Sequence, residues 1–129
     1  MRLQMEGDEQ QSKSRVVYID TIQAWESYVQ QATNEGCPAV VHFSASWCMP
    51  SVVMNPVMEE LASNFQEVLF LNVDVDDVKD VASRMEIKAM PTFLLMKDGA
   101  AIDKLVGANP DEIRKWIDTL VQSTHVHKA

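Results

Sequence analysis

Residues 44–52 read SASWCMPSV, and they join two segments of contrasting pattern. The residues before them, AVVHF at 39–43, form a continuous apolar run of the kind that is buried on both faces in a parallel sheet. The segment 52–65, which begins at the last residue of the quoted stretch, carries apolar side chains at helical spacing. A strand, a short loop and a helix are therefore expected here, with Cys48 in the loop and Ser51 three residues further on.

The helix expected at 52–65 contains a proline, Pro56, in its interior. A proline there removes one backbone donor and crowds the preceding turn, so the helix should be kinked. Val53, Val57 and Leu61 stand four residues apart and are expected to share one stripe of this helix.

The rest of the chain alternates strand and helix patterns. Strands are expected at 16–19, 39–43, 68–75, 92–97 and 101–106. Helices are expected at 21–35, 52–65, 77–85 and 109–123. The order is β-α-β-α-β-α-β-β-α, which predicts an α/β fold with a central mixed sheet of about five strands flanked by four helices. Helical connections imply parallel pairing of the early strands, and the late hairpin implies an antiparallel edge.

The chain has 129 residues, a length that fits one domain. We expect a polar N-terminal extension at 1–15, the folded domain at 16–122 and a polar C-terminal tail at 123–129. The extension has no apolar core region and no glycine at position 2, so neither a secretory signal nor N-myristoylation is expected. These features favour a cytoplasmic location.

The formal net charge of −8 excludes two classes of partner. Nucleic acids and anionic membrane surfaces are bound mainly through basic patches, and this chain would repel both. No apolar run approaches the length of a membrane span.

Two cysteines, Cys37 and Cys48, are too few for a disulfide scaffold. The extended residues between them would hold them about 20 Å apart, so a bridge between them is not expected. No metal site is expected, because neither cysteine has further ligands near it. His125 and His127 fall in the polar tail, and the acidic run at 74–77 lacks the turn glycine of a calcium loop.

Three stretches together carry a resemblance to a known family: ASWCMPS at 45–51, VDVDDVKDVASRMEIKAMPTFLLMKDG at 73–99 and DKLVGANPDEI at 103–113. They resemble the thioredoxin superfamily, and the resemblance extends over about residues 16–122. The plant cytosolic h class is the most similar in character. Ser51 makes the chain similar to the monothiol CxxS thioredoxin-like proteins of that class.

The resemblance implies that Cys48 is an exposed nucleophile at the N-terminus of the kinked helix, where unpaired backbone N–H groups stabilise a thiolate. Trp47 would flank the site, and Pro50 would occupy the first helical turn. Met90 and Pro91 match the family's cis-proline step, which offers backbone hydrogen bonds to an extended substrate segment. The substrate-binding residues implied in this way are Met49, Met90, Pro91 and Ala108.

Three positions depart from the family pattern. Ser51 replaces the resolving thiol; its hydroxyl can hydrogen-bond the Cys48 thiolate but cannot displace a bound substrate. His42 stands where thioredoxins usually have a buried acid that helps to deprotonate the resolving cysteine. We interpret His42 as a neutral, packed strand residue rather than as a base. Val52 stands where many relatives carry a basic residue.

The predicted function is monothiol thiol–disulfide exchange through mixed disulfides at Cys48. Its activity would be of the disulfide isomerase or deglutathionylation type, with low reductase activity. A non-catalytic protein-binding module or holdase is an alternative. A second alternative is that Ser51 is an engineered Cys→Ser change that traps substrates of a dithiol thioredoxin h, although an engineer would have no reason to alter His42 as well.

The predicted substrates are disulfide-containing or glutathionylated proteins. No cofactor is expected, and glutathione is a candidate thiol co-substrate. The resemblance is compatible with a monomer or a weak dimer.

Overall fold

The computed structural model describes residues 15–128. The N-terminal extension expected at 1–15 lies outside the described residues except for Arg15, and so does Ala129. The strands are β1 (Val16–Ile19), β2 (Ala39–Ser44), β3 (Leu69–Asp74), β4 (Thr92–Lys97) and β5 (Ala100–Val106). The helices are α2 (Ile22–Glu35), α3 (Met49–Val52), α4 (Asn55–Asn64), α5 (Lys79–Arg84) and α6 (Pro110–Lys128).

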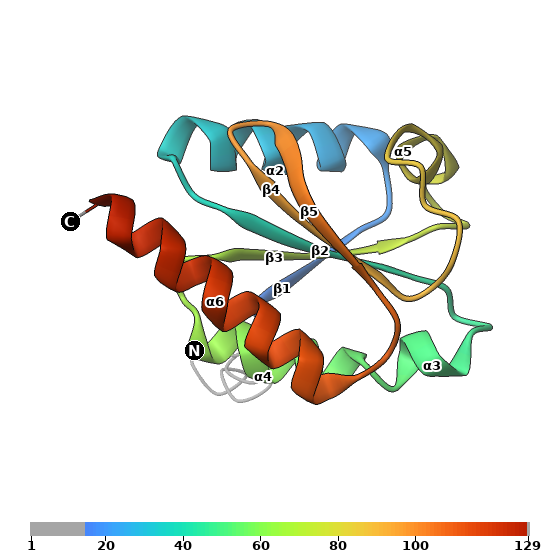
Figure 1. Cartoon of the computed structure of the whole chain (residues 1–129). Coiled ribbons are helices and arrows are strands. Elements are labelled where there is room, and N and C mark those ends of the chain that lie inside the picture. Colours follow the sequence, from blue (N-terminus) through green and yellow to red (C-terminus); the bar gives the residue numbers. More distant parts are fainter. Residues whose placement is uncertain (1–14, 129) are drawn as a thin grey trace, which may run out of the picture.

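The five strands form one mixed sheet in the order β1-β3-β2-β4-β5 (Figure 1). Strand β3 pairs in parallel with β1 and β2, and β4 pairs antiparallel with β2 and β5. This arrangement confirms the predicted mixed α/β sheet of the thioredoxin fold. Helices α3 and α4 together correspond to the single kinked helix of the prediction.

Helices cover both faces of the sheet (Figure 1). One buried cluster contains Met54, Met58 and Leu61 of the kinked segment together with Ile113 and Ile117 of α6. A separate cluster on the other face joins the sheet to α2 and α5, and its members include Trp25 of α2, Val81 of α5 and Val78, which immediately precedes α5. No helix among residues 15–128 is long and apolar enough to cross a membrane.

The helix ends follow local sequence signals. The side chain of Thr21 accepts a hydrogen bond from the Ala24 N–H at 3.0 Å and caps α2 at its start. Gly36 ends α2 in the left-handed conformation, with φ of 66°. The side chain of Asn109 accepts from the Glu112 N–H at 3.1 Å, which gives α6 the N-cap that the sequence predicted.

The kink lies just before Pro56. Helix α3 ends at Val52 and α4 begins at Asn55, so the break stands where the missing Pro56 N–H leaves a carbonyl of the preceding turn without its helical partner. The predicted stripe of Val53, Val57 and Leu61 is not a single buried face, because Val53 is 56% exposed. The break rotates the buried face, and Met54 is fully buried instead.

The final helix is longer than the sequence analysis predicted. It was expected to end at Ser123, but α6 continues to Lys128, so residues 123–128 extend the helix. The physical reason is the absence of a stop signal, since no glycine or proline follows Pro110 in the chain.

Candidate active site

Two loops at one edge of the sheet bring Cys48 and Met90 together. Cys48 follows the carboxyl end of β2, and Met90 precedes the start of β4. Because β2 and β4 are antiparallel, these two ends meet at the same edge. The thiol of Cys48, which is half-buried, donates to the Met90 carbonyl oxygen with an S···O distance of 3.7 Å.

The Met90–Pro91 peptide bond is cis. The loop after β5 packs against it, since the Gly107 N–H donates to the Pro91 carbonyl oxygen at 3.0 Å. Ala108, the next residue, is exposed beside this contact. The structure therefore gathers Cys48, Met90, Pro91 and Ala108 from three separate loops.

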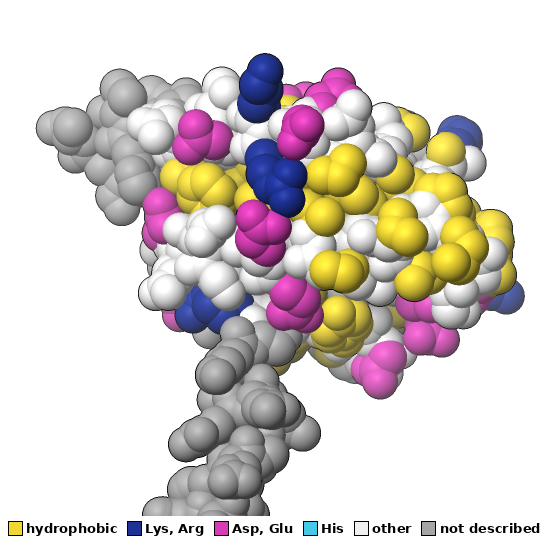
Figure 2. Space-filling view, turned by 90° about the horizontal axis from the view of Figure 1, so that it is seen from below, with side chains coloured by type: hydrophobic (Ala, Val, Ile, Leu, Met, Phe, Trp, Pro, Cys, Tyr) yellow, Lys and Arg dark blue, Asp and Glu magenta, His cyan; other side chains and the backbone are white. Residues whose placement is uncertain are grey.

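Exposed apolar residues flank Cys48 in the chain. Trp47 is 65% exposed and Met49 is 64% exposed. Figure 2, seen from below Figure 1, shows hydrophobic side chains gathered at the end of the molecule where α3 lies. The Trp47 indole N–H donates to Asp76 Oδ2 at 2.7 Å, which holds the ring beside the loop. The contact of Trp47 with Asp76 could not be predicted from the sequence, because a pairing over 29 residues leaves no local signal.

Ser51 lies in the interior of the protein. Its side chain is fully buried, and its hydroxyl oxygen has no hydrogen-bond partner. The possible hydrogen bond between Ser51 and Cys48 is not formed in this structure, in which the Cys48 thiol donates to the Met90 carbonyl oxygen. An unpaired buried hydroxyl is a destabilising feature. Pro50 occupies the first turn of α3 and is exposed.

His42 is a buried residue of the central strand β2. Its ring stacks on Phe93 with a centroid distance of 4.7 Å, and Nδ1 lies 3.3 Å from the amide nitrogen of Asn72. Burial lowers the pKa of His42 from 6.5 to about 4, so the ring is neutral near pH 7. With Nδ1 accepting from Asn72, the proton lies on Nε2, which has no partner.

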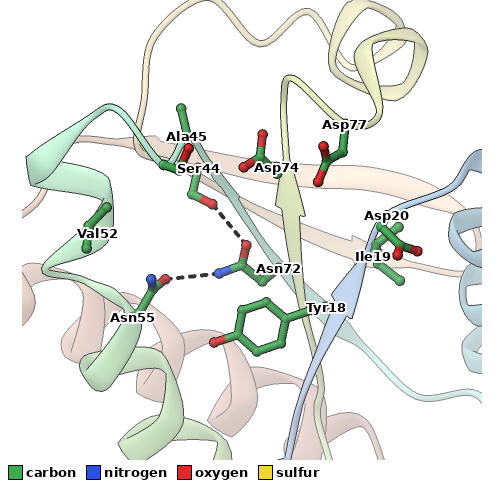
Figure 3. A pocket seen from close by; sticks show the side chains of 11 residues that line it. Tyr18, Ile19, Asp20, Ser44, Ala45, Val52, Asn55, Asn72, Asp74 and Asp77 are labelled. Carbon is green, nitrogen blue, oxygen red and sulfur yellow. Dashed lines mark hydrogen bonds between the residues drawn. The ribbon is translucent and has the colours of Figure 1, made fainter.

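A chain of polar side chains connects the sheet to the helix break, and the sequence analysis did not identify it (Figure 3). Asn72 accepts from the Ser44 hydroxyl at 2.9 Å and donates to Asn55 Oδ1 at 3.0 Å. These bonds tie β2, β3 and the start of α4 together. The one available signal was an asparagine inside the apolar run VLFLNVDV, where a buried amide requires partners.

The second cysteine lies at the other end of β2. The Cys37 thiol donates to the Glu67 carbonyl oxygen at 3.2 Å, and both cysteines are free. Burial is the main reason that the pKa of Cys37 is raised. Among the described residues, no group of three or more His, Cys, Asp and Glu side chains could hold a metal ion.

Comparison with known proteins gives a family match over most of the chain. The Thioredoxin family model matches residues 16–119. The chain belongs to the thioredoxin family. It is therefore a thioredoxin-family thiol–disulfide protein, and members of this family act on disulfide-containing protein substrates.

Individual relatives come from plants. The chain is 62% identical over 113 residues to Thioredoxin-like protein CXXS1 of Arabidopsis thaliana, covering 88% of this chain and 96% of the relative. It is 52% identical to a protein of the same name from Oryza sativa subsp. japonica, covering 85% of this chain and 83% of the relative. A crystal structure of a poplar thioredoxin h mutant superposes with a TM-score of 0.82 at 39% identity, covering 85% of each chain.

Proposed function

We propose that this thioredoxin-family protein is a monothiol exchange catalyst. The Cys48 thiolate attacks one sulfur of a substrate disulfide, forms a mixed disulfide with it and expels the other sulfur as a thiolate. A thiolate from elsewhere then attacks the mixed disulfide, takes the substrate sulfur and regenerates the Cys48 thiolate. Each step exchanges one S–S bond for another, so Cys48 ends the cycle in the thiolate form in which it began, and the thiol that regenerates it leaves as part of a disulfide.

The observation that carries this proposal is the presence of a serine at position 51. Ser51 lies one turn from Cys48, at the position of the resolving cysteine in dithiol relatives, and a serine side chain has no sulfur. Cys37 cannot substitute for a resolving cysteine, because it lies beyond the opposite end of β2. The mixed disulfide therefore persists until an external thiol arrives.

The source of that thiol determines the outcome. A second cysteine of the same substrate gives a rearranged disulfide, which is isomerase chemistry. Glutathione releases the substrate as a mixed disulfide with glutathione. When the attacked disulfide is itself a glutathione adduct and Cys48 takes the glutathionyl sulfur, the protein substrate leaves as a free thiol, and a second glutathione then removes the first as glutathione disulfide. The plant relatives named CXXS1 support this assignment, and they also support Ser51 as a natural residue. We place this activity in the cytoplasm, where glutathione keeps thiols reduced.

Coupled reduction of insulin tests the proposal. With a thioredoxin reductase as the electron donor, the wild-type chain should not sustain turnover, because it forms no internal disulfide for the reductase to recycle. The Cys37→Ser variant should behave in the same way. Efficient turnover by the wild-type chain would contradict the monothiol assignment.

Capture from a cell extract tests whether Cys48 forms mixed disulfides with substrate proteins. Proteins should be held through Cys48 in a form that dithiothreitol releases. Alkylation of Cys48 should abolish capture. Partners that remain bound after alkylation would favour the binding-module alternative.

A further inference from the structure

A cavity of about 460 Å³ opens beside the loop that carries Cys48 (Figure 3). It lies at the carboxyl ends of β1, β3 and β2. Ile19 and Asp20 line it from the end of β1, Asn72 and Asp74 from β3, and the segment 44–46 from the end of β2. The position of the cavity follows from the order in which the chain connects these strands.

Neighbouring strands β3 and β2 send their following helices to opposite faces of the sheet. Strand β2 leads through α3 to α4 on one face, and β3 leads to α5 on the other (Figure 1). In open α/β sheets, the crevice outside the carboxyl ends at such a switch point is where ligands bind. The cavity occupies this crevice.

The lining of the cavity selects for positive charge. Three carboxylates line it, from Asp20, Asp74 and Asp77, and no Lys, Arg or His is among its lining residues. Among residues 15–128, none of the three forms a salt bridge with a basic side chain. In addition, the buried side chains of Ser44 and Asn72 line the cavity, with the Ser44 hydroxyl donating to Asn72 Oδ1.

The cavity and the Pro91 loop flank Cys48 along the same edge of the sheet. Pro91 lies on the β4 side of β2, and the cavity lies on the β3 side. Ser46, which lines the cavity, is two residues from Cys48 in the chain, a span of about 7 Å at most. A substrate segment attached to Cys48 can therefore place a neighbouring side chain in the cavity.

We propose that the cavity binds an arginine side chain of the substrate segment whose disulfide Cys48 attacks, so that Asp20, Asp74 and Asp77 determine substrate specificity. This inference rests on the proposed exchange function and names its substrate class. A guanidinium suits the site because its five donors can reach several separated acceptors at once, whereas an ammonium is a point charge. Electrostatic attraction by the carboxylates brings basic segments to the thiol.

Exchange rates with matched peptides test the inference. Short peptides carry one cysteine as a mixed disulfide with thionitrobenzoate, and a single arginine, glutamine or glutamate is placed at each of several positions from that cysteine. At the best position the arginine peptide should react about fivefold faster than the glutamine peptide, the size expected for a few partly exposed ion pairs. The preference should shrink at high salt, because exposed charges are screened.

Two variants distinguish an effect of the cavity carboxylates from an effect of the net charge of the protein. In Asp20→Asn/Asp77→Asn, the ratio of the arginine rate to the glutamine rate should fall to about one. In Asp118→Asn, which changes an exposed carboxylate of α6 outside the cavity, the ratio should stay at its wild-type value. Equal rates for all peptides in the wild type, or an equal loss of preference in Asp118→Asn, would overturn the inference.

Peptide binding to a variant that lacks the Cys48 nucleophile tests the cavity independently of the exchange reaction. In Cys48→Ala, a cysteine-free arginine peptide should shift the side-chain amide NMR signals of Asn55 and Asn72. These shifts would support the cavity even if the wild-type chain exchanged no disulfide. Unmoved amide signals would overturn it even if exchange were fast. A stronger response to free spermidine than to the peptide would also overturn it, because the cavity would then bind a free polyamine.

Discussion

Replacing His42 with glutamine should make the stability of the domain less sensitive to acid. In the folded chain burial holds the pKa of His42 at about 4, against an ordinary value of 6.5. The unfolded chain therefore binds a proton at a higher pH than the folded chain does. The stabilising contribution of the neutral ring is fully present above about pH 6.5 and is lost as the pH falls toward about 4.

The magnitude follows from the shift. A difference of about 2.5 units, at about 1.36 kcal/mol per unit, amounts to about 3 kcal/mol when the loss is complete. Between about pH 7.5 and about pH 5, where few carboxylates titrate, the loss should be about 2 kcal/mol. Glutamine does not titrate, and its side-chain oxygen can still accept a hydrogen bond from the amide nitrogen of Asn72.

Urea unfolding of the wild-type and His42→Gln chains at these two pH values measures the effect. The wild-type chain should lose about 2 kcal/mol more free energy of unfolding than the variant does. The remaining histidines, His125 and His127, are present in both chains, so the difference reports His42 alone. Equal losses would refute the reasoning, as would an NMR titration of the His42 ring with a midpoint near 6.5.

Three substitutions probe the rest of the site. Ser51→Cys should introduce turnover with a thioredoxin reductase in the insulin assay, because it supplies a resolving sulfur; no gain would mean that position 51 is not what limits reduction. Ser51→Ala should raise the free energy of unfolding in urea by about 1 kcal/mol, since it removes a buried hydroxyl without a partner; a loss of stability would show that the hydroxyl is paired in solution. Asn72→Ala should lower the free energy of unfolding by about 3 kcal/mol, because it breaks the polar chain between β2, β3 and α4. The control Asn64→Ala, at an exposed position of α4, should change it by less than about 0.5 kcal/mol, and equal effects would contradict the role of the polar chain.

Most of the fold could be predicted because its signals are local. The strand at 16–19 and the hairpin strand at 92–97 have the predicted bounds, since apolar runs between turn residues set both. Pro56 predicted the kink because its effect depends only on its own ring. The exposure of Val53 was not predictable in this way, because this residue lies at the break between α3 and α4, where the helical period no longer applies.

The site was less accessible to sequence reasoning. Cys48 and Pro91 could be identified from motifs, but the side-chain bonds around them join residues distant in the chain. Asn72 pairs with Ser44 over 28 residues and with Asn55 over 17. Such pairs depend on strand register and on where the helix breaks, and neither can be predicted from a local sequence pattern. The burial of Ser51 away from hydrogen-bond partners depends on the same packing.

The most direct test of the monothiol account is the recovery of scrambled ribonuclease in a glutathione buffer. After Cys48 attacks, the substrate keeps a free thiol close to the mixed disulfide, at an effective concentration of about millimolar order. That thiol can displace Cys48 and leave a new pairing. The wild-type chain and Cys37→Ser should therefore accelerate the return of ribonuclease activity, and Cys48→Ala should not. If Cys48→Ala accelerates recovery as well as the wild-type chain does, exchange at this thiol is not the function.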